Sequence, residues 1–329
     1  MPVVVLTESE LRQCVSLDKE AIQLVAEAFS ALARGEAEMP PILSLDIADR
    51  NGEVDIKTAY IRGFDSFAIK LSSGFFDNPK LGLPSLSGMM VLLSAATGRV
   101  EAVLLDNGYL TDVRTAAAGG VAAQYLARQD CTTAGIIGSG LQARLQIEAL
   151  KLVRDFKHLR IWARDREKAQ DYADTMTNKL GVDIVVDDSP EAVVRRSDVV
   201  ITTTPSRTPI ITADWLHPGL HITAMGSDAP EKNELEPAVL VKADHFVCDR
   251  RSQSLRLGEL HHAVEAGVLP SDVAVDELGE IITGTKSGRQ GDDQVTVCDL
   301  TGTGVQDTAI ALYAYRRAQE RGYGTIIES

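Results

Sequence analysis

The period of hydrophobic positions changes along the chain, and each change predicts a different structure. Near the N-terminus Ile22, Val25, Phe29 and Leu32 recur at helical spacing, which predicts a helix from about Asp18 to Arg34. From residue 42 to 105, short apolar runs separated by glycines predict strands instead. These predicted strands lie at Val54 and Ile56, Phe67–Leu71, Met89–Leu93 and Val100–Leu105.

An alanine-rich helix is expected around Asp112–Leu126, and beyond Thr133 strands and helices alternate. Such alternation predicts a parallel sheet covered on both faces. Its predicted strands are Ala134–Ile137, Arg160–Ala163, Asp183–Val186, Val199–Thr202, Leu220–Met225 and His245–Cys248. After a strand at Val295–Leu300, the last helix, Asp307–Arg321, is expected to return to the N-terminal part. The first domain, residues 1–128 plus 305–329, is therefore predicted to be discontinuous, with residues 129–304 inserted in it.

A glycine-rich turn at the start of the inserted domain indicates a dinucleotide site. The segment Gly138-Ser139-Gly140-Leu141-Gln142-Ala143 follows an apolar strand and opens an amphipathic helix. Such a turn lets a pyrophosphate approach bare backbone at a helix N-terminus, where unpaired N–H groups favour negative charge. This context distinguishes the segment from a plain tight turn and predicts a Rossmann domain that binds NAD(P).

The residue that ends the second strand bears on which dinucleotide binds. NAD-selective domains usually place an acidic residue there, whereas an arginine suits a 2′-phosphate. Arg164, with Arg166 nearby, therefore favours NADP(H). The alternative is a solvated Arg164 with Asp165 contacting the ribose.

Composition excludes several other classes of protein. The 329 residues are 44% hydrophobic, suit two domains, and contain no apolar run long enough for a membrane span. A net charge of −14 argues against nucleic acid and anionic membranes as partners. The four cysteines are scattered and the N-terminus lacks a signal-peptide pattern, so reduced, mostly buried thiols in a cytoplasmic protein are expected.

Polar residues in apolar settings are the candidates for chemistry. Lys70 interrupts a strand, so that it either reaches the surface or points into a cleft. Arg114, at the start of a small-residue helix, suits a bidentate carboxylate contact or a structural ion pair with Asp112. Asp228 follows a strand and, shielded from bulk water, would act as a general acid or base; otherwise it caps the next segment. The segment Asp299–Asp307 either lines the nicotinamide pocket or is only a strand–helix turn.

No metal site is predicted. His261 and His262 are adjacent on a predicted helix and point in different directions, and we expect no i,i+4 carboxylate–histidine pair to complete a site.

Over essentially its whole length the chain resembles the ornithine cyclodeaminase/μ-crystallin family. The segments that carry the resemblance are Phe67–Ser72, Val113–Ala118, Gly138–Gln142, Ala224–Asp228 with Lys232, Glu234 and Leu235, and Asp299–Asp307. Within the family the chain most resembles the cyclodeaminase-like proteins of bacterial ectoine-utilisation clusters, on Gly74–Lys80, Asp106–Asp112 and Gly258–His262. The resemblance implies a homodimer in which the discontinuous mixed α/β domain provides dimerisation and substrate binding.

The resemblance also implies roles for individual residues. Lys70 and Arg114 would bind a substrate carboxylate, with Lys70 also counted as catalytic, and Asp228 would be the acid or base. Asp55 would contact the substrate, as a glutamate does in the ornithine enzyme. We further assign Lys57, Ser85, Thr301 and Gly302 to the substrate, and Thr115, Thr203, Met225 and Gly226 to the cofactor beside the glycine-rich turn and Arg164.

Two departures from the family pattern bear on the substrate. The family's substrate-binding arginine near the first strand is missing from Met39–Leu43, and Lys57 stands where the ornithine enzyme has methionine. The pocket would keep its charge while its shape changes, so a substrate carboxylate is implied but not ornithine.

Three functions follow in order. The first is cyclodeamination of a small amino or diamino acid by transient hydride transfer, in ectoine or amino-acid catabolism. The second is a net ketimine reductase or amino-acid dehydrogenase that uses the same residues. The third is an NADPH-dependent binder without turnover, which the presence of Lys70, Arg114 and Asp228 disfavours.

Overall fold

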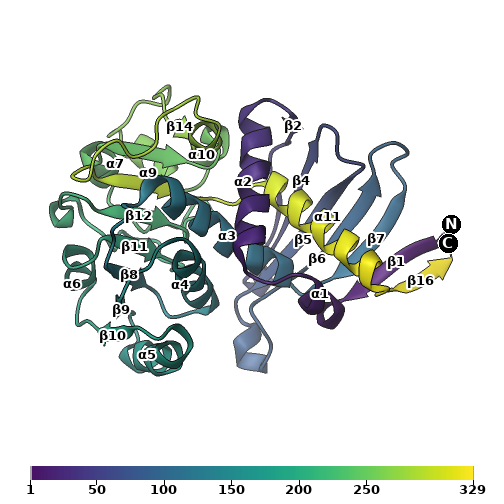
Figure 1. The fold of residues 1–329 in the computed structure, drawn as a ribbon, viewed down its shortest axis with the longest axis horizontal. Helices are drawn as coiled ribbons and strands as arrows, with labels where there is room; N and C mark the ends of the chain where they lie inside the picture. The colour runs from purple at the N-terminus through teal and green to yellow at the C-terminus, as the bar shows by residue number, and fades with distance from the viewer. Residues whose placement is uncertain (1, 329) are drawn as a thin grey trace. The chain divides into compact units, whose positions relative to one another are not determined.

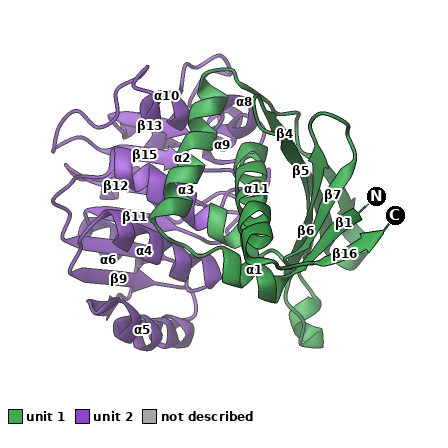
Figure 2. Cartoon of the chain, turned by 45° about the vertical axis from the view of Figure 1, so that its right-hand side comes forward, with its two compact units in different colours: residues 1–114, 303–329 green, residues 115–302 purple. Residues whose placement is uncertain are grey.

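The computed structural model describes residues 2–328, and the chain forms two compact units (Figure 2). Unit 1 comprises Met1–Arg114 and Thr303–Ser329, and unit 2 comprises Thr115–Gly302. The predicted fold class, a Rossmann domain inserted in a mixed α/β domain, is confirmed. The first division falls inside helix α3 (Tyr109–Leu126), earlier than the boundary after residue 128 expected from the sequence, because α3 is one uninterrupted helix.

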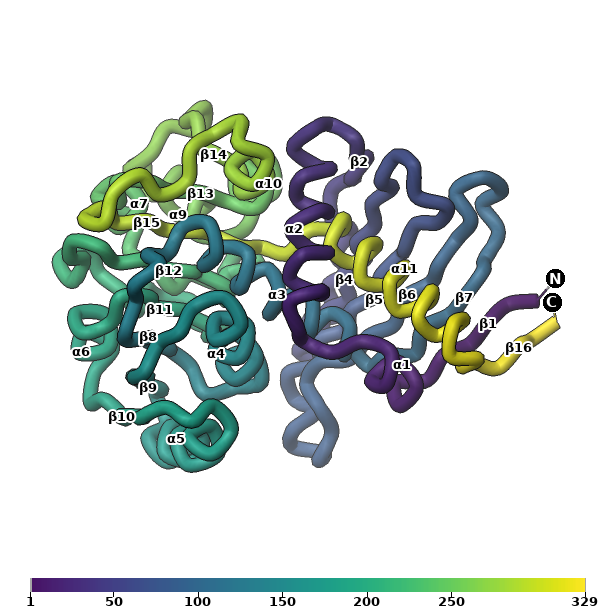
Figure 3. Tube along the Cα trace, in the orientation of Figure 1, coloured from purple at the N-terminus to yellow at the C-terminus, as the bar shows by residue number. Residues whose placement is uncertain are grey.

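Unit 1 is built on a mixed sheet. The strand order is β16-β1-β7-β6-β5-β4-β2, with β3 paired to β4, and only β1 and β7 are parallel neighbours. Its strands are β1 (Pro2–Thr7), β2 (Ala37–Glu38), β3 (Leu43–Ile47), β4 (Gly52–Ile61), β5 (Ser66–Phe75), β6 (Leu86–Ser94), β7 (Val100–Leu105) and β16 (Thr325–Glu328). Figure 3 shows both ends of the chain on this unit, where β16 runs antiparallel to β1.

Two long helices cover one face of this sheet (Figure 1). Helix α2 (Lys19–Ala33) is capped by Asp18, as its amphipathic pattern predicted, and α11 (Gly304–Arg321) begins at a capping box of Thr303 and Gln306. Their apolar faces meet β4 in a core of Ala28, Leu32, Ala59, Ile61, Val305 and Ala309. The remaining helices of this unit are α1 (Glu8–Cys14) and the short η1 (Ala48–Arg50) and η2 (Asn78–Leu81). The return of the last helix to the N-terminal part, predicted from the sequence, is confirmed.

Unit 2 is a doubly wound parallel sheet. The order β10-β9-β8-β11-β12-β15-β13-β14 reverses direction between β8 and β11, the switch point at which Rossmann domains bind their ligands. Its strands are β8 (Thr133–Ile137), β9 (His158–Trp162), β10 (Asp183–Val186), β11 (Val199–Thr202), β12 (His221–Ala224), β13 (His245–Cys248), β14 (Asp276–Glu277) and β15 (Thr296–Asp299). Its helices, besides α3, are α4 (Leu141–Val153), α5 (Arg166–Leu180), α6 (Pro190–Arg195), η3 (Ala213–Trp215), α7 (Pro237–Lys242), α8 (Arg251–Ser254), α9 (Glu259–Glu265) and α10 (Leu278–Ile282).

Separate apolar cores support the Rossmann sheet. One contains Ile136, Phe156, Ile161 and Tyr172, and the other contains Val200, Ile222, Leu260 and Val297. The four cysteines are buried and unpaired, as expected. Among residues 2–328, no helix is both long and apolar enough to span a bilayer.

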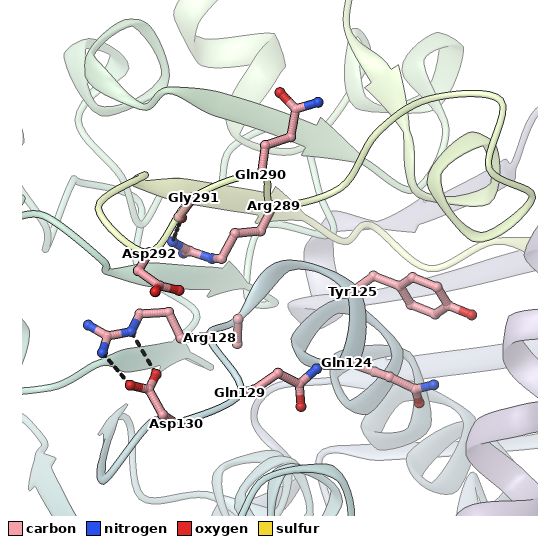
Figure 4. A pocket seen from close by; sticks show the side chains of 10 residues that line it. Gln124, Tyr125, Arg128, Gln129, Asp130, Arg289, Gln290, Gly291 and Asp292 are labelled. Carbon is pink, nitrogen blue, oxygen red and sulfur yellow. Dashed lines mark hydrogen bonds and ion pairs between the residues drawn. The ribbon is translucent and has the colours of Figure 1, made fainter.

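Two buried arginines of unit 2 cap the end of α3. The Arg154 guanidinium donates to the carbonyls of Ala123, Gln124 and Ala127 at 2.8–2.9 Å. Arg289 donates from Nε to the carbonyl of Leu126 at 2.7 Å (Figure 4). These carbonyls have no partner within the helix, so the guanidinium groups replace water at a buried helix end.

We predict that Arg154→Ala destabilises unit 2 by about 3 kcal/mol, because each buried carbonyl left without a donor costs roughly 1–3 kcal/mol. The measurement is the thermal unfolding midpoint. Arg195→Ala is the control, since it removes only an exposed pair with Glu191 and should cost under about 1 kcal/mol. Equal midpoints for the two variants would contradict the prediction.

Candidate active site

The glycine-rich turn joins β8 to α4 at the switch point of unit 2. Gly138 has φ +121°, and an added Cβ would lie 2.6 Å from Oγ1 of Thr203 at the end of β11. The Gly138 N–H donates to the carbonyl of Trp162 at 2.9 Å, which ties the turn to β9. Glycine is needed here because both the backbone conformation and the close approach exclude a side chain.

The N-terminus of α4 provides an anion site. Gly140 is its N-cap and makes no side-chain capping bond, and the first turn contains no acidic residue. The N–H groups of this turn are therefore available to a negatively charged ligand. Ala143 is fully buried, as expected for the residue that allows close packing of helix and strand. The structure thus places Ser139, Leu141 and Gln142 in the predicted turn.

The end of β9 distinguishes the two interpretations of Arg164. Asp165 is the N-cap of α5 and accepts from the N–H groups of Glu167 and Lys168 at 3.1 and 3.2 Å. Its carboxylate therefore already serves the helix, and Arg166 is ion-paired with Asp188. Arg164 is exposed beside them.

Other assigned cofactor and substrate residues lie in loops at the same carboxyl edge of the sheet. Met225 and Gly226 follow β12, and the Gly226 N–H donates to Glu234 at 2.8 Å. Thr301 and Gly302 follow β15 and donate their N–H groups to the buried Asp249, each at 2.8 Å. Asp299–Asp307 is thus a strand–helix connection held by a carboxylate.

Thr115 stands apart from those loops. It lies in α3, and its carbonyl accepts from Gln146 of α4 at 2.9 Å. Its assignment to the cofactor stays a prediction.

Unit 1 contains a buried cluster of cations. Lys57 of β4 and Lys70 of β5 are cross-strand partners and are 7% and 2% exposed. The Lys70 ammonium lies 3.1 Å from Oδ2 of Asp307, and Nε of Arg114 lies 2.8 Å from its Oδ1. Lys70 therefore points inward, and the partner of Arg114 in this cluster is Asp307. We call Lys57, Lys70, Arg114 and Asp307 the cation cluster.

The charges of the cluster change the acidity of its members. Burial, reinforced by the charges of Arg114 and Lys57, lowers the pKa of Lys70 to about 7 despite the opposing effect of Asp307. Burial alone would raise the pKa of Asp307, but Arg114, Lys70 and Lys57 outweigh it and hold that pKa below its usual value. Asp307 is thus an ionised carboxylate that offsets part of the positive charge.

Asp307 and Asp106 were not among the predicted site residues. Asp106 is 1% exposed, and burial raises its pKa to about 6 although the charge of Lys70 opposes this. The available signal for Asp307 was the polar run Gln306-Asp307-Thr308 in a helix whose other residues are apolar. Buried polar residues in such a run need partners, which indicates a site.

The remaining substrate candidates of unit 1 lie near the cluster in sequence or register. Asp55 is half-buried, precedes Lys57 by two residues on β4, and accepts from the Ser44 hydroxyl at 2.6 Å. Ser85 lies before β6, and its carbonyl accepts from the Phe75 N–H at 2.8 Å. Strand periodicity puts Asp55 and Lys57 on one face of the sheet.

Asp228 differs from its expected environment. We expected it to be shielded from bulk water, but its side chain is 52% exposed and accepts from the Lys232 ammonium at 2.6 Å. The loop after β12 is open at this residue, because Gly226 and Ser227 turn inward and Asp228 does not.

The histidine pair also needs a correction. Nε2 of His261 lies 3.7 Å from Glu265, so the i,i+4 carboxylate–histidine pair that we expected to be missing is present. His261, His262 and Glu265 offer ligand atoms within 4.8 Å of one another. However, Nε2 of His262 is 2.8 Å from the carbonyl of Lys232, and Nδ1 of His261 is 3.3 Å from that of Leu255. Each ring thus has a structural bond, and the absence of a metal stays a prediction.

A polar hollow of about 490 Å³ lies elsewhere in unit 2, between the end of α3 and the segment before β15 (Figure 4). Its arginines are occupied: Arg128 pairs with Asp130 at 2.8 Å, and Arg289 donates to main-chain carbonyls. We therefore assign no ligand to it.

Known proteins resemble the chain over its whole length. An "uncharacterized cyclodeaminase" of Sinorhizobium fredii is 56% identical over 99% of this chain and 98% of its own. The structure of Thermococcus litoralis Δ1-pyrroline-2-carboxylate reductase with NADH and L-proline superposes with a TM-score of 0.92 at 31% identity, covering 99% of this chain and 100% of that one. An archaeal alanine dehydrogenase dimer with bound NAD gives a TM-score of 0.93 at 36% identity, covering 100% and 99%.

The sequence model of the "Ornithine cyclodeaminase/mu-crystallin family" matches residues 2–322. The match includes both the glycine-rich turn of unit 2 and the cation cluster of unit 1. The resemblance inferred from short segments is therefore confirmed, and the chain belongs to the ornithine cyclodeaminase/μ-crystallin family.

Proposed function

We propose that this chain is an NAD(P)-dependent oxidoreductase that interconverts a small imine and an amino acid, both carrying a carboxylate. The observation that carries the proposal is the cation cluster, in which three buried cations share one carboxylate in contact, Asp307. Buried charges need partners, so the cluster supports binding of an anionic group such as a substrate carboxylate. The solved relatives named above are an imine reductase and an amino-acid dehydrogenase.

NAD(P) is the cofactor, and unit 2 has a suitable site for it. Gly138–Gln142 and the α4 N-terminus suit the pyrophosphate, and Thr203, Met225 and Gly226 lie on adjoining strand ends of the same edge. When bound, the nicotinamide donates or accepts hydride. The solved relatives hold NAD or NADH, so the preference for NADP(H) rests on Arg164 alone and stays a prediction.

Residues of unit 1 would bind and orient the substrate. The Arg114 guanidinium keeps donors beyond the Nε that faces Asp307 and suits a carboxylate, and Lys57 adds a second cation. Lys70, with its pKa near neutrality, suits a proton carrier or a charge partner of the carboxylate. Asp55 and Ser85 are proposed to contact the rest of the substrate, as are Thr301 and Gly302.

Asp228 is the proposed acid or base for the nitrogen. Its contact with Lys232 keeps it charged partner to an ammonium group rather than isolated. An exposed carboxylate exchanges protons with water readily, which suits a group that must be reprotonated in each cycle.

Cyclodeamination is the second candidate, favoured by the cyclodeaminase name of the 56% identical relative. There hydride returns to the product, ammonia leaves, and no cofactor is consumed. A link to ectoine utilisation and a cytoplasmic location stay predictions.

We also propose a homodimer. The alanine dehydrogenase relative is a dimer. The sheet of unit 1 has large exposed apolar side chains, among them Leu43, Leu45, Leu86 and Ile326. Apolar groups gathered on one sheet are typical of an interface.

The first prediction concerns stoichiometry. Δ1-pyrroline-2-carboxylate with NADH or NADPH should oxidise one cofactor per imine consumed, because the proposed reaction is a net reduction. Ornithine, lysine and 2,4-diaminobutyrate with substoichiometric NAD⁺ or NADP⁺ should release no ammonium beyond the cofactor supplied. Ammonium in excess of cofactor, measured by an enzymatic assay, would instead establish the cyclodeaminase.

The second prediction concerns pH. Lys70 is charged below pH about 7 and neutral above it, so substrate KM should rise as pH increases through this value, since a cation attracting the carboxylate is lost. In Asp307→Asn the rise should begin at lower pH, because Asp307 is the charge that holds the proton on Lys70. The measurement is KM against pH for both proteins, and identical profiles would remove Lys70 from substrate binding.

The third prediction concerns the dinucleotide. Arg164→Ala should weaken NADPH binding by about tenfold and leave NADH binding unchanged, since only NADPH carries the 2′-phosphate. Arg166→Ala is the matched control, because Arg166 is already paired with Asp188. Fluorescence titration gives both dissociation constants. Equal losses for NADH and NADPH would show that Arg164 does not read the phosphate.

A further inference from the structure

Three buried carboxylates of unit 2 form a series of hydrogen bonds at the carboxyl edge of the sheet. Asp299, Glu259 and Glu234 are 0–1% exposed and have no part in the function proposed above. Each accepts the main-chain N–H of another residue in or near the series, so the three side chains fix the loops between strands and helices.

The series begins at the end of β15, where Asp299 holds the start of α9. Its Oδ2 accepts from the N–H groups of Glu259 and Leu260 at 3.1 and 3.4 Å. Gly258, just before them, has φ +97°, and an added Cβ would lie 2.7 Å from Oδ2 of Asp299. Glycine is therefore required for this close approach.

Glu259 then binds two segments that flank Asp228. Oε1 accepts a very short hydrogen bond from the Ser227 hydroxyl and a 2.9 Å bond from the Glu234 N–H. Oε2 accepts from Nδ2 of Asn233 at 2.7 Å and from the Leu235 N–H at 3.0 Å. All four donors belong to the residues immediately before or after the loop 228–232.

Further bonds hold the same loop ends. The Glu234 carboxylate accepts from the Gly226 N–H at 2.8 Å, and it also accepts from the N–H and hydroxyl of Thr204 at 2.6 and 2.8 Å. Nε2 of His262 contacts the carbonyl of Lys232 at 2.8 Å. Both ends of the loop with the Asp228–Lys232 pair are thus tied to buried groups, while Asp228 itself remains exposed.

We propose that Glu259 is the positioning residue of Asp228, which it holds in place through Ser227 on one side and Asn233–Leu235 on the other. The inference rests on the proposed role of Asp228 as proton carrier. It accounts for the segment Gly258-Glu259-Leu260-His261-His262: the glycine makes room for Asp299, the glutamate binds the loop, and His262 binds its far end. A carboxylate is required because it accepts all four bonds, whereas a glutamine amide would direct N–H groups at two of the donors.

The kinetic test uses Ser227→Ala, which removes one bond to Glu259 and leaves the other three. The reaction is Δ1-pyrroline-2-carboxylate reduction with NADH. We expect kcat to fall by about tenfold while KM and the NADH dissociation constant change less than about twofold, the pattern of a lost orientation. In an Asp228→Asn background the same change should cost less than about twofold, because the residue being positioned is gone. Equal losses in both backgrounds would overturn the proposal.

A second measurement does not depend on turnover. In Glu259→Gln, hydrogen–deuterium exchange should accelerate in peptides covering residues 226–235 and stay unchanged in those covering the glycine-rich turn, 138–142. Glu236→Gln is the matched control, since its carboxylate binds the Ala213 N–H instead and should leave 226–235 unchanged. Unchanged exchange at 226–235 in Glu259→Gln would overturn the proposal. A wild-type protein that binds NADH but reduces no imine would instead refute the proposed function, and exchange would still decide whether Glu259 holds the loop.

Discussion

The ionised carboxylate of Asp307 is the group on which unit 1 depends. It comes from the last helix, is fully buried, and contacts Lys70 of β5 and Arg114 of α3. Without it, the two cations and neighbouring Lys57 would be buried together with no carboxylate in contact, which is strongly unfavourable. With it, a surplus of positive charge remains beside one negative charge. The same interaction therefore joins three elements of the fold and leaves a place where an anion is stabilised.

Unit 2 uses buried carboxylates differently. Glu234, Glu259 and Asp249 accept mainly main-chain N–H and hydroxyl groups, so their negative charge is distributed over hydrogen-bond donors of the loops. Burial raises the pKa of each, whereas the donors stabilise the charged form. Long loops that would otherwise be mobile are thereby given fixed ends, which a hydride-transfer site needs because reacting atoms must be held in position. In unit 1 charge serves recognition, and in unit 2 it serves geometry.

Much of this organisation follows from local sequence pattern. The strands β8 to β13, the turn at Gly138 and the helix capped by Asp18 were predicted because periodicity, glycine and capping residues act over a few neighbours. Pairing between distant segments is different: β16 pairs with β1, and nothing near Ile326 or Val4 reveals that register. Asp307 was missed for the same reason, since its partners are far away in the chain. The exposure of Asp228 was misjudged because strand ends show where a residue lies and not which way its loop turns.

The order of synthesis gives the discontinuity of unit 1 a further meaning. Helix α11 and strand β16 are made last, so the ribosome completes all of unit 2 before the sheet of unit 1 receives its final edge strand. Until then Lys70 and Arg114 lack their carboxylate, and burying them is unfavourable. The nascent N-terminal part therefore cannot close its core early, and the missing negative charge delays its final folding until the chain is complete.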